Sequence, residues 1–292
     1  MSVLRRVGLF LITNLLILIT FGIVISLLGI RGEGVYGLML ICFVWGMGGA
    51  FFSLLISRWM AKKAYGIQVI SPNTSDANAR WIYNMVQRLI EREGLPMPEV
   101  GVYHSNEPNA FATGSSPKKS IIAFSTGLLN SMNHEQIQSV AAHEISHIKN
   151  GDMLTLTLLT GLANAFVMFL ARIIAIAIDN FLRGDDDRGG LGFLAYFLVV
   201  SVLETVFMLL AYIPIAAFSR WREYRADAGS AKLTSPSAMA SALETLGGYT
   251  GMLDKKNSFS IAKIQSRRRV SIFSTHPSIE SRIKRLREMN IH

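Results

Sequence analysis

Four long stretches of the chain are apolar, and each is long enough to cross a lipid bilayer. Residues 7–30 and 34–57 contain no charged side chain, and residues 153–178 and 191–219 contain one each. A helix needs ~20 apolar residues to cross a hydrocarbon layer of ~30 Å, and soluble core helices do not stay apolar for so long. The pattern predicts four transmembrane helices arranged as two hairpins.

The first stretch could instead be a cleaved signal peptide, because Arg5 and Arg6 precede it. Its apolar run is longer than the ~7–15 residues of a signal peptide, and no small-residue cleavage pattern follows it. We therefore expect residues 7–30 to remain as a membrane anchor.

The segments outside the spans show the shorter periods of a folded domain. Helical spacing of apolar residues predicts a helix over 76–93, and short runs rich in Val, Ile, Phe and Thr between 98 and 126 predict a small antiparallel sheet or hairpin. Asn133 and Gln136 have the spacing of a capping box, which predicts a helix from there to about Lys149.

Towards the C-terminus we expect helices over 220–232 and 235–246, a mobile loop over 247–274 that could gate a cleft, and a last helix with Pro277 as its first residue. The predicted class is a mainly α membrane protein with four transmembrane helices and an α+β domain containing a small sheet. Its four segments are a transmembrane hairpin (1–57), a domain part (58–152), a second hairpin (153–219) and a second domain part (220–292).

Charge indicates which side of the membrane the domain occupies. The chain is 50% hydrophobic and only 17% charged, and all but four of its 29 Lys and Arg residues lie in segments 1–6, 58–152 and 220–292. Basic residues are retained on the cytoplasmic side, so both termini and the domain are predicted to be cytoplasmic. The single cysteine, Cys42, excludes a disulfide framework and suits a reducing compartment.

The net charge of +9 requires no nucleic acid as a partner. Basic residues near a membrane are attracted to anionic lipid headgroups, which we expect as a partner here. The run 267–269 is basic, but no interleaved aromatic residues or recognised nucleic-acid motif accompany it.

The strongest chemical signal is His143-Glu144-Ile145-Ser146-His147, an H-E-x-x-H pattern on the helix predicted to start near residue 133. Side chains at i and i+4 of a helix share one face, so both imidazoles can reach one Zn²⁺ ion at ~2.0–2.1 Å. Glu144 can then accept a proton from the attacking water. A chance match on a surface helix is the competing interpretation.

Glu223 is the candidate third metal ligand. The predicted ligand helix ends just before the third span and Glu223 follows the fourth, so an antiparallel hairpin returns it to the side of His143 and His147. Two His and one Glu leave a position open for water, as catalytic zinc sites require. Asp227, one turn further on, can accept the second ring proton of one imidazole.

The alternative for Glu223 and Asp227 is a pair of surface carboxylates that neutralise Arg222 and Arg225. A second open question concerns His276, which could donate to the oxyanion formed when water attacks a peptide carbonyl. A solvent-exposed residue that caps the last helix is the competing interpretation of His276.

Other functions lack supporting motifs. No G-x-x-x-x-G-K-[ST] sequence is present, which argues against nucleotide-driven proteolysis, and the histidines lie outside the apolar spans, unlike those of intramembrane metalloproteases. A membrane adaptor or transporter with structural zinc would use Arg172 and Glu204, because charged residues inside a membrane are usually functional. A stabilising ion pair between the third and fourth spans explains both residues more simply.

The chain resembles the HtpX membrane proteases, bacterial inner-membrane relatives of the CAAX prenyl-protein endopeptidases. The resemblance covers essentially the whole chain and rests on four motifs: His143-Glu144-x-x-His147, Glu223-x-x-x-Asp227, the segment 108–114 (Pro-Asn-Ala-Phe-Ala-Thr-Gly), and Ser274-Thr275-His276-Pro277 followed by Arg282-Ile283.

This resemblance implies a zincin-like (gluzincin) domain with one Zn²⁺ per chain. It also implies an ATP-independent endopeptidase that removes misfolded or damaged membrane proteins from the cytoplasmic side, often under envelope stress. Asn109, Ala110, Phe111 and Ala112 would then belong to an edge strand that pairs with the backbone of a polypeptide substrate.

Overall fold

A computed structural model describes residues 33–183, 190–256 and 272–289, and for 249–256 only the backbone. The first predicted span, residues 7–30, lies outside the described residues. The chain divides into two compact units. The first combines the N-terminal part of the chain up to Ser53 with Leu156–Ile215, and the second combines Leu54–Thr155 with Ala216–His292.

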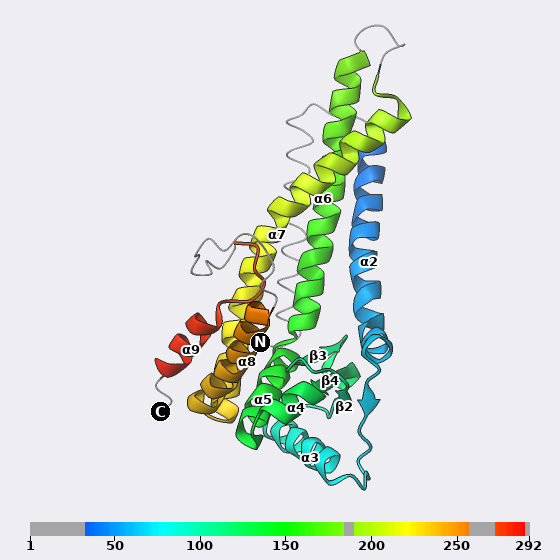
Figure 1. The fold of residues 1–292 in the computed structure, drawn as a ribbon. Helices are drawn as coiled ribbons and strands as arrows, with labels where there is room; N and C mark the ends of the chain where they lie inside the picture. Colours follow the sequence, from blue (N-terminus) through cyan, green and yellow to red (C-terminus); the bar gives the residue numbers. More distant parts are fainter. Residues whose placement is uncertain (1–32, 184–189, 257–271, 290–292) are drawn as a thin grey trace. The chain divides into compact units, whose positions relative to one another are not determined.

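Three helices in the described part of the chain are long and apolar enough to cross a membrane. They are α2 (Glu33–Tyr65), α6 (Asp152–Arg183) and α7 (Gly192–Leu233) (Figure 1). The second, third and fourth apolar stretches are therefore helical, as predicted. Residues 220–232 are helical, as predicted, and they continue α7 without a break after the fourth apolar stretch.

The first unit is held by close helix contact and one ion pair. A Cβ added at Gly46 of α2 would lie 2.5 Å from the backbone N of Ala165 in α6, so only glycine allows this approach. The predicted pair is confirmed, since Arg172 donates to Glu204 at 2.5 Å. The charged residues within the third and fourth apolar stretches, Arg172 and Glu204, therefore neutralise each other.

The second unit contains a four-stranded mixed sheet in the order β1-β2-β4-β3. Its strands are β1 (Gln68–Val69), β2 (Glu99–Tyr103), β3 (Ala110–Gly114) and β4 (Ser120–Ser125). The antiparallel prediction is right for β3–β4 but wrong for β2–β4, which is parallel. Strand β1, which pairs antiparallel with β2, was not predicted. The fully buried β4 takes the position between β2 and β3, which leaves β3 at the edge.

Helices α3 (Ala77–Arg92), α4 (Thr126–Ser131) and α5 (His134–Asn150) lie beside this sheet and supply its core (Figure 1). Asp76 caps α3, and Asn133 and Gln136 form the predicted capping box of α5. The short elements η1 (Pro117–Lys119) and α4 flank β4. The core between α3, α5 and the sheet includes Met85, Val86, Leu89, Ile122, Phe124, Val140, Ala141 and Ile145.

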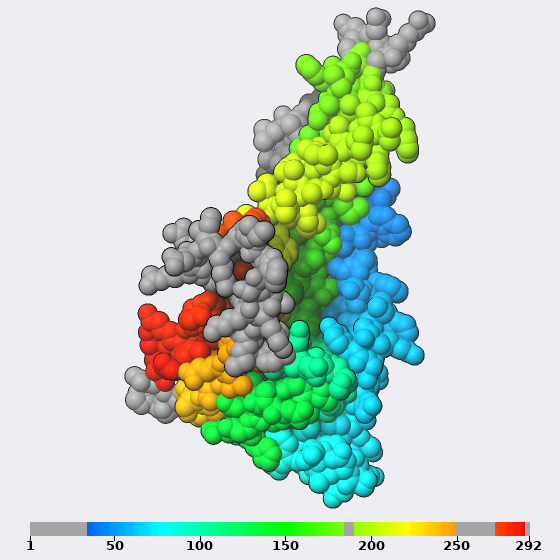
Figure 2. Space-filling view, viewed as in Figure 1, coloured from blue at the N-terminus to red at the C-terminus, as the bar shows by residue number. Residues whose placement is uncertain are grey.

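Two predictions near the C-terminus are wrong. Helix α8 (Pro236–Lys256) continues through residues 247–256, where a loop was expected; the rest of that loop, 257–271, lies outside the described residues. The last helix, α9 (Ile279–Arg287), begins after Ser278, whose side chain accepts from the Ser281 N–H, so Pro277 precedes the helix. Helix α9 packs on α8, and the space-filling view shows the two surfaces in contact (Figure 2).

Candidate metal centre

Helix α5 carries two imidazoles on one buried face. Its capping box fixes the start of the helix, and β3, α3 and α8 pack around it. His143 and His147 lie one turn apart, with 6% and 7% of their surface exposed. Their Nε2 atoms are 3.2 Å apart, so both lone pairs can face a common point.

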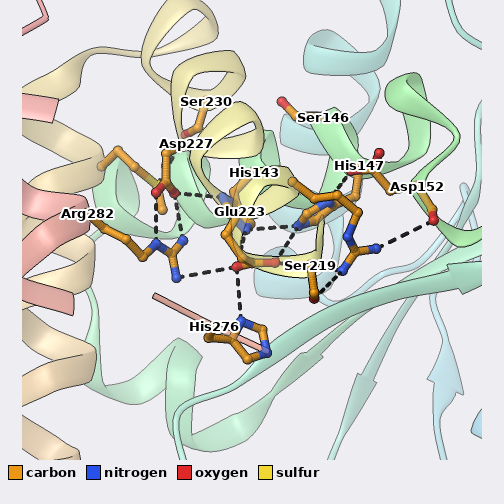
Figure 3. Close-up of polar contacts among 12 residues, drawn as sticks. His143, Ser146, His147, Asp152, Ser219, Glu223, Asp227, Ser230, His276 and Arg282 are labelled. Atoms are coloured by element: carbon orange, nitrogen blue, oxygen red, sulfur yellow. Dashed lines mark hydrogen bonds and ion pairs between the residues drawn. The ribbon is translucent and has the colours of Figure 1, made fainter. Parts of the chain in front are cut away.

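Helix α7 brings Glu223 to the same point (Figure 3). Its Oε1 lies 3.4 Å from Nε2 of His147, and its Oε2 lies 3.6 Å from Nε2 of His143. Glu223 is 3% exposed, although its neighbour in the sequence, Arg222, suggested that it lies on the surface. His143, His147 and Glu223 form a possible metal site, with ligand atoms all within 4.8 Å of one another.

The spacing of these atoms fits zinc. Ligands at ~2.0–2.1 Å from a tetrahedral ion are about 3.3 Å from one another, and the observed separations are 3.2, 3.4 and 3.6 Å. Two imidazoles and one carboxylate are also a donor set that leaves one position open for water. The residues therefore fit a catalytic zinc ion.

The electrostatics of the cluster favour a cation. Burial lowers the pKa of His147, but the carboxylates of Asp152 and Glu223 outweigh it and raise the pKa to about 9. The pKa of His143 is likewise raised, since Asp227 and Glu223 outweigh the effect of burial. Burial raises the pKa of Glu223, yet the imidazoles of His143, His147 and His276 hold it well below its ordinary value.

Asp227 lies behind His143, on the side away from the cluster. Its Oδ1 is 3.0 Å from Nδ1 of His143, although the angle is outside that of a standard hydrogen bond. Arg282 of α9 donates to both Asp227 oxygens, at 2.8 and 2.6 Å. The surface-carboxylate alternative is wrong in that Glu223 and Asp227 are both buried. Asp227 pairs with Arg282, while Arg222 does lie 4.0 Å from Oε1 of Glu223.

Glu144 is partly buried between the imidazoles and the sheet. Burial raises the pKa of its carboxyl group, while His143, His147 and a hydrogen bond from the Ala112 backbone act in the opposite direction with less effect. A carboxylate with a raised pKa is a better proton acceptor near neutral pH. The Ala112 contact also links this side chain to β3.

His276 reaches the cluster from the segment before α9. Its Nδ1 lies 3.1 Å from Oε2 of Glu223, and 66% of the side chain is exposed. The capping interpretation is wrong, because Ser278 caps α9. An exposed imidazole beside a buried ligand carboxylate is able to contact a molecule bound at the site.

The segment from Asn109 to Ala112 forms the sheet edge next to α5. Asn109 immediately precedes β3, and its carbonyl accepts from the Ser125 N–H of β4 at 2.9 Å. Backbone groups alternate in direction along an antiparallel strand, so those of Ala110 and Ala112 point away from β4. At this edge of β3 the backbone of Ala112 hydrogen-bonds Glu144, and the backbone groups of Ala110 point away from β4.

Three residues of the cluster were not predicted from the sequence as part of it. Asp152 contacts the second imidazole, Arg225 contacts Asp152, and Arg282 contacts Asp227. The only local signal for Asp152 is its position after Gly151, which has a left-handed conformation (φ 65°) and turns the chain at the end of α5. Nothing in the local sequence indicates the partners of the two arginines.

Comparison with known proteins identifies the family of the chain. Residues 76–290 match the sequence profile of Peptidase family M48. Protease HtpX from Tolumonas auensis is 45% identical over 292 residues, covering 98% of this chain and 99% of that protein. Protease HtpX from Shewanella pealeana is 46% identical over 287 residues, with 97% and 99% covered.

A solved structure shares the fold. The crystal structure of S. mikatae Ste24p aligns with a TM-score of 0.60 at 18% sequence identity and covers 97% of this chain. The chain spans 64% of the length of that protein. At this identity the similarity concerns the fold alone.

Proposed function

Because the chain belongs to peptidase family M48, as an HtpX-type membrane protease, we propose that it is a zinc-dependent, ATP-independent endopeptidase of the bacterial inner membrane. Its substrates would be misfolded or damaged membrane proteins, cleaved on the cytoplasmic side as part of protein quality control and the stress response. The observation that carries the proposal is the buried cluster of His143, His147 and Glu223 with Glu144 beside it.

His143, His147 and Glu223 would hold the zinc ion. When bound, zinc would supply a Lewis acid that polarises the peptide carbonyl and acidifies water. Glu144 accepts the proton of the attacking water and passes it to the leaving amine. His276 donates a hydrogen bond to the developing oxyanion, a role supported by its exposure and its 3.1 Å contact with Glu223. Asp227 holds the ring of His143.

The substrate would add a strand to the edge of the sheet. The backbone groups of Ala110 point away from β4 and would pair with the substrate, and the hydrogen bond from Ala112 to Glu144 supports a position of this edge beside the catalytic carboxylate. Strand addition recognises the backbone of a substrate and demands little of its sequence. Such recognition suits an enzyme that removes many different damaged proteins. The backbone groups of Asn109 and Phe111 point towards β4 and would hold the strand in register.

The distribution of basic residues supports a cytoplasmic active site. Lys and Arg are concentrated outside the apolar helices, whereas residues 184–189 include three consecutive aspartates. We propose that both termini are cytoplasmic and that the basic segments contact anionic headgroups. The four-segment organisation, two hairpins alternating with two parts of one protease domain, follows from the same topology.

The substitution Glu144→Gln tests the proposal, in full-length protein reconstituted in detergent. Cleavage of casein or of a membrane-protein substrate should fall by about 10²–10⁴-fold because the proton acceptor is lost. The zinc content should stay at that of the wild type, since Glu144 is not one of the ligands. The control is Glu135→Gln, an exposed carboxylate on the same helix. Wild-type cleavage by the Glu144→Gln protein would refute the proposed chemistry.

A further inference from the structure

Asp152 is the most completely buried carboxylate around the metal centre. It is the first residue of α6, directly after the left-handed Gly151, and none of its surface is exposed. Its Oδ2 lies 2.7 Å from Nδ1 of His147, and its Oδ1 accepts a short hydrogen bond from Arg225 (Figure 3). Each oxygen of the carboxylate therefore has a partner at the site.

These contacts determine which nitrogen of His147 is free. A carboxylate paired with a guanidinium is ionised and can only accept hydrogen bonds, so the proton of the imidazole must lie on Nδ1. In the neutral ring that binds a metal, the lone pair then lies on Nε2, which faces Nε2 of His143 at 3.2 Å and Oε1 of Glu223 at 3.4 Å. This is the tautomer that a metal ligand needs.

Arg225 connects this arrangement to the third ligand. It lies two residues after Glu223 on α7, so one helix contacts His147 at Nε2 through Glu223 and at Nδ1 through Arg225 and Asp152. Its guanidinium also packs over the Trp221 ring, 4.6 Å from the centroid, which restricts its rotamer. Trp221, Glu223 and Arg225 thus belong to one segment that sets the position of the imidazole.

A purely structural role for Asp152 is the alternative. An acidic residue in the first turn of a helix interacts favourably with the helix dipole, and a buried ion pair with Arg225 can help the fold. Neither effect requires the 2.7 Å contact with Nδ1 of His147. That contact is short and charge-assisted. It is made by Nδ1, the ring nitrogen that remains available for a hydrogen bond when Nε2 binds the metal.

We propose that Asp152, paired with Arg225, is a positioning residue that fixes the tautomer and the ring orientation of His147 for metal binding. This inference rests on the proposed zinc-dependent function. On this proposal, α6 and α7 together hold one metal ligand in place. Both helices continue into the apolar spans.

The test measures zinc affinity and ligand geometry in purified full-length protein. Asp152→Asn should weaken zinc binding, measured by competition with a chelator, by about 10–100-fold, as is typical when such a partner is lost. The visible absorption spectrum of the Co²⁺-substituted protein should also change, because the amide can donate to Nδ1 and allow the ring to rotate. A purely structural carboxylate would lower the melting temperature without changing either readout in the folded protein.

Two further variants keep the test decisive. Arg225→Gln should also weaken zinc binding, and Arg225→Lys should recover part of the loss because it restores a positive charge. If Asp152→Asn does not fold, these two variants carry the test. The matched control is Glu99→Gln, a carboxylate that pairs with Arg58 and Lys62 at 3.2 and 2.9 Å and should leave zinc affinity unchanged.

Wild-type zinc affinity and an unchanged Co²⁺ spectrum in Asp152→Asn or Arg225→Gln would overturn the inference. His147→Ala separates that result from a failure of the proposed function. If His147→Ala binds zinc as tightly as the wild type, the metal site itself is assigned wrongly. If only His147→Ala loses zinc, the site is right and the positioning role of Asp152 is wrong.

Discussion

The approach of α7 to α5 depends on a glycine that takes no part in the chemistry. A Cβ added at Gly229 of α7 would lie 2.3 Å from Oγ and 2.8 Å from Cβ of Ser146, the residue before His147. The hydroxyl could rotate away from Ala142, whose carbonyl accepts its hydrogen bond, but the Cβ of Ser146 cannot move without the backbone. Gly229→Ala must therefore displace one helix from the other.

The size of the displacement follows from the contact distance. Carbon atoms in contact are about 3.5–4.0 Å apart, so the helices must separate by about 0.7–1.2 Å near Gly229. A metal site tolerates about 0.2 Å in its ligand distances, and Glu223 lies less than two turns from the clash. We expect Gly229→Ala to weaken zinc binding at least about 10-fold and to destabilise the fold by about 1–3 kcal/mol.

Zinc affinity, cleavage rate and melting temperature should be compared between the wild type and three variants: Gly229→Ala, a control, and a double exchange. Gly248→Ala is the matched control, because nothing lies within 4 Å of a Cβ at this helical glycine. The exchange Ser146→Gly with Gly229→Ala moves the small residue to the other helix and should recover zinc binding. Its helix propensity should not lower stability, because Gly229→Ala gains about 1 kcal/mol and Ser146→Gly loses less than that. Unaltered zinc affinity and cleavage in Gly229→Ala alone would refute this explanation of the site.

The remaining predictions concern the sheet edge, the membrane helices and the metal. Ala110→Pro removes an N–H that points away from β4, so kcat/KM for polypeptides should fall about 5–10-fold, as expected for one lost hydrogen bond. The zinc content should not change. An unaffected kcat/KM would exclude strand addition at this position. Glu204→Gln leaves Arg172 without its carboxylate and should lower the melting temperature in detergent. Replacing both residues by leucine should restore most of the lost melting temperature. Equal melting temperatures for the wild type, Glu204→Gln and the double leucine variant would show that the pair has no stabilising role. Removing zinc with a chelator should lower the melting temperature, and adding zinc at 100 times its Kd should recover about 2.7 kcal/mol; the Glu223→Ala protein should show no such recovery.

Local signals in the sequence were sufficient for much of the fold and for part of the site. The capping box of Asn133 and Gln136 forms within four residues, so its spacing alone locates the start of α5. The same helical geometry makes His143 and His147 neighbours wherever the helix lies. Glu223 required only the additional argument that an apolar hairpin returns to the side from which it left.

Features that depend on distant parts of the chain were not predictable in this way. The parallel pairing of β2 with β4 arises because a buried strand takes the centre of the sheet, a choice made by packing and not by the strand itself. Gly247 and polar residues suggested a loop, but α8 continues through this position, and Ile279 of α9 packs against the buried face of α8. Asp152 has its role only because the turn at Gly151 points it back at His147.

The central claim is that two imidazoles of α5 and one carboxylate of α7 hold a single zinc ion. Zinc K-edge X-ray absorption on the purified full-length protein tests this most directly. We predict one zinc per chain with two nitrogen ligands and at least one carboxylate oxygen at about 2.0–2.2 Å, and loss of that signal in Glu223→Ala. A stoichiometry near zero in the wild type, or an unchanged spectrum in Glu223→Ala, would contradict the claim.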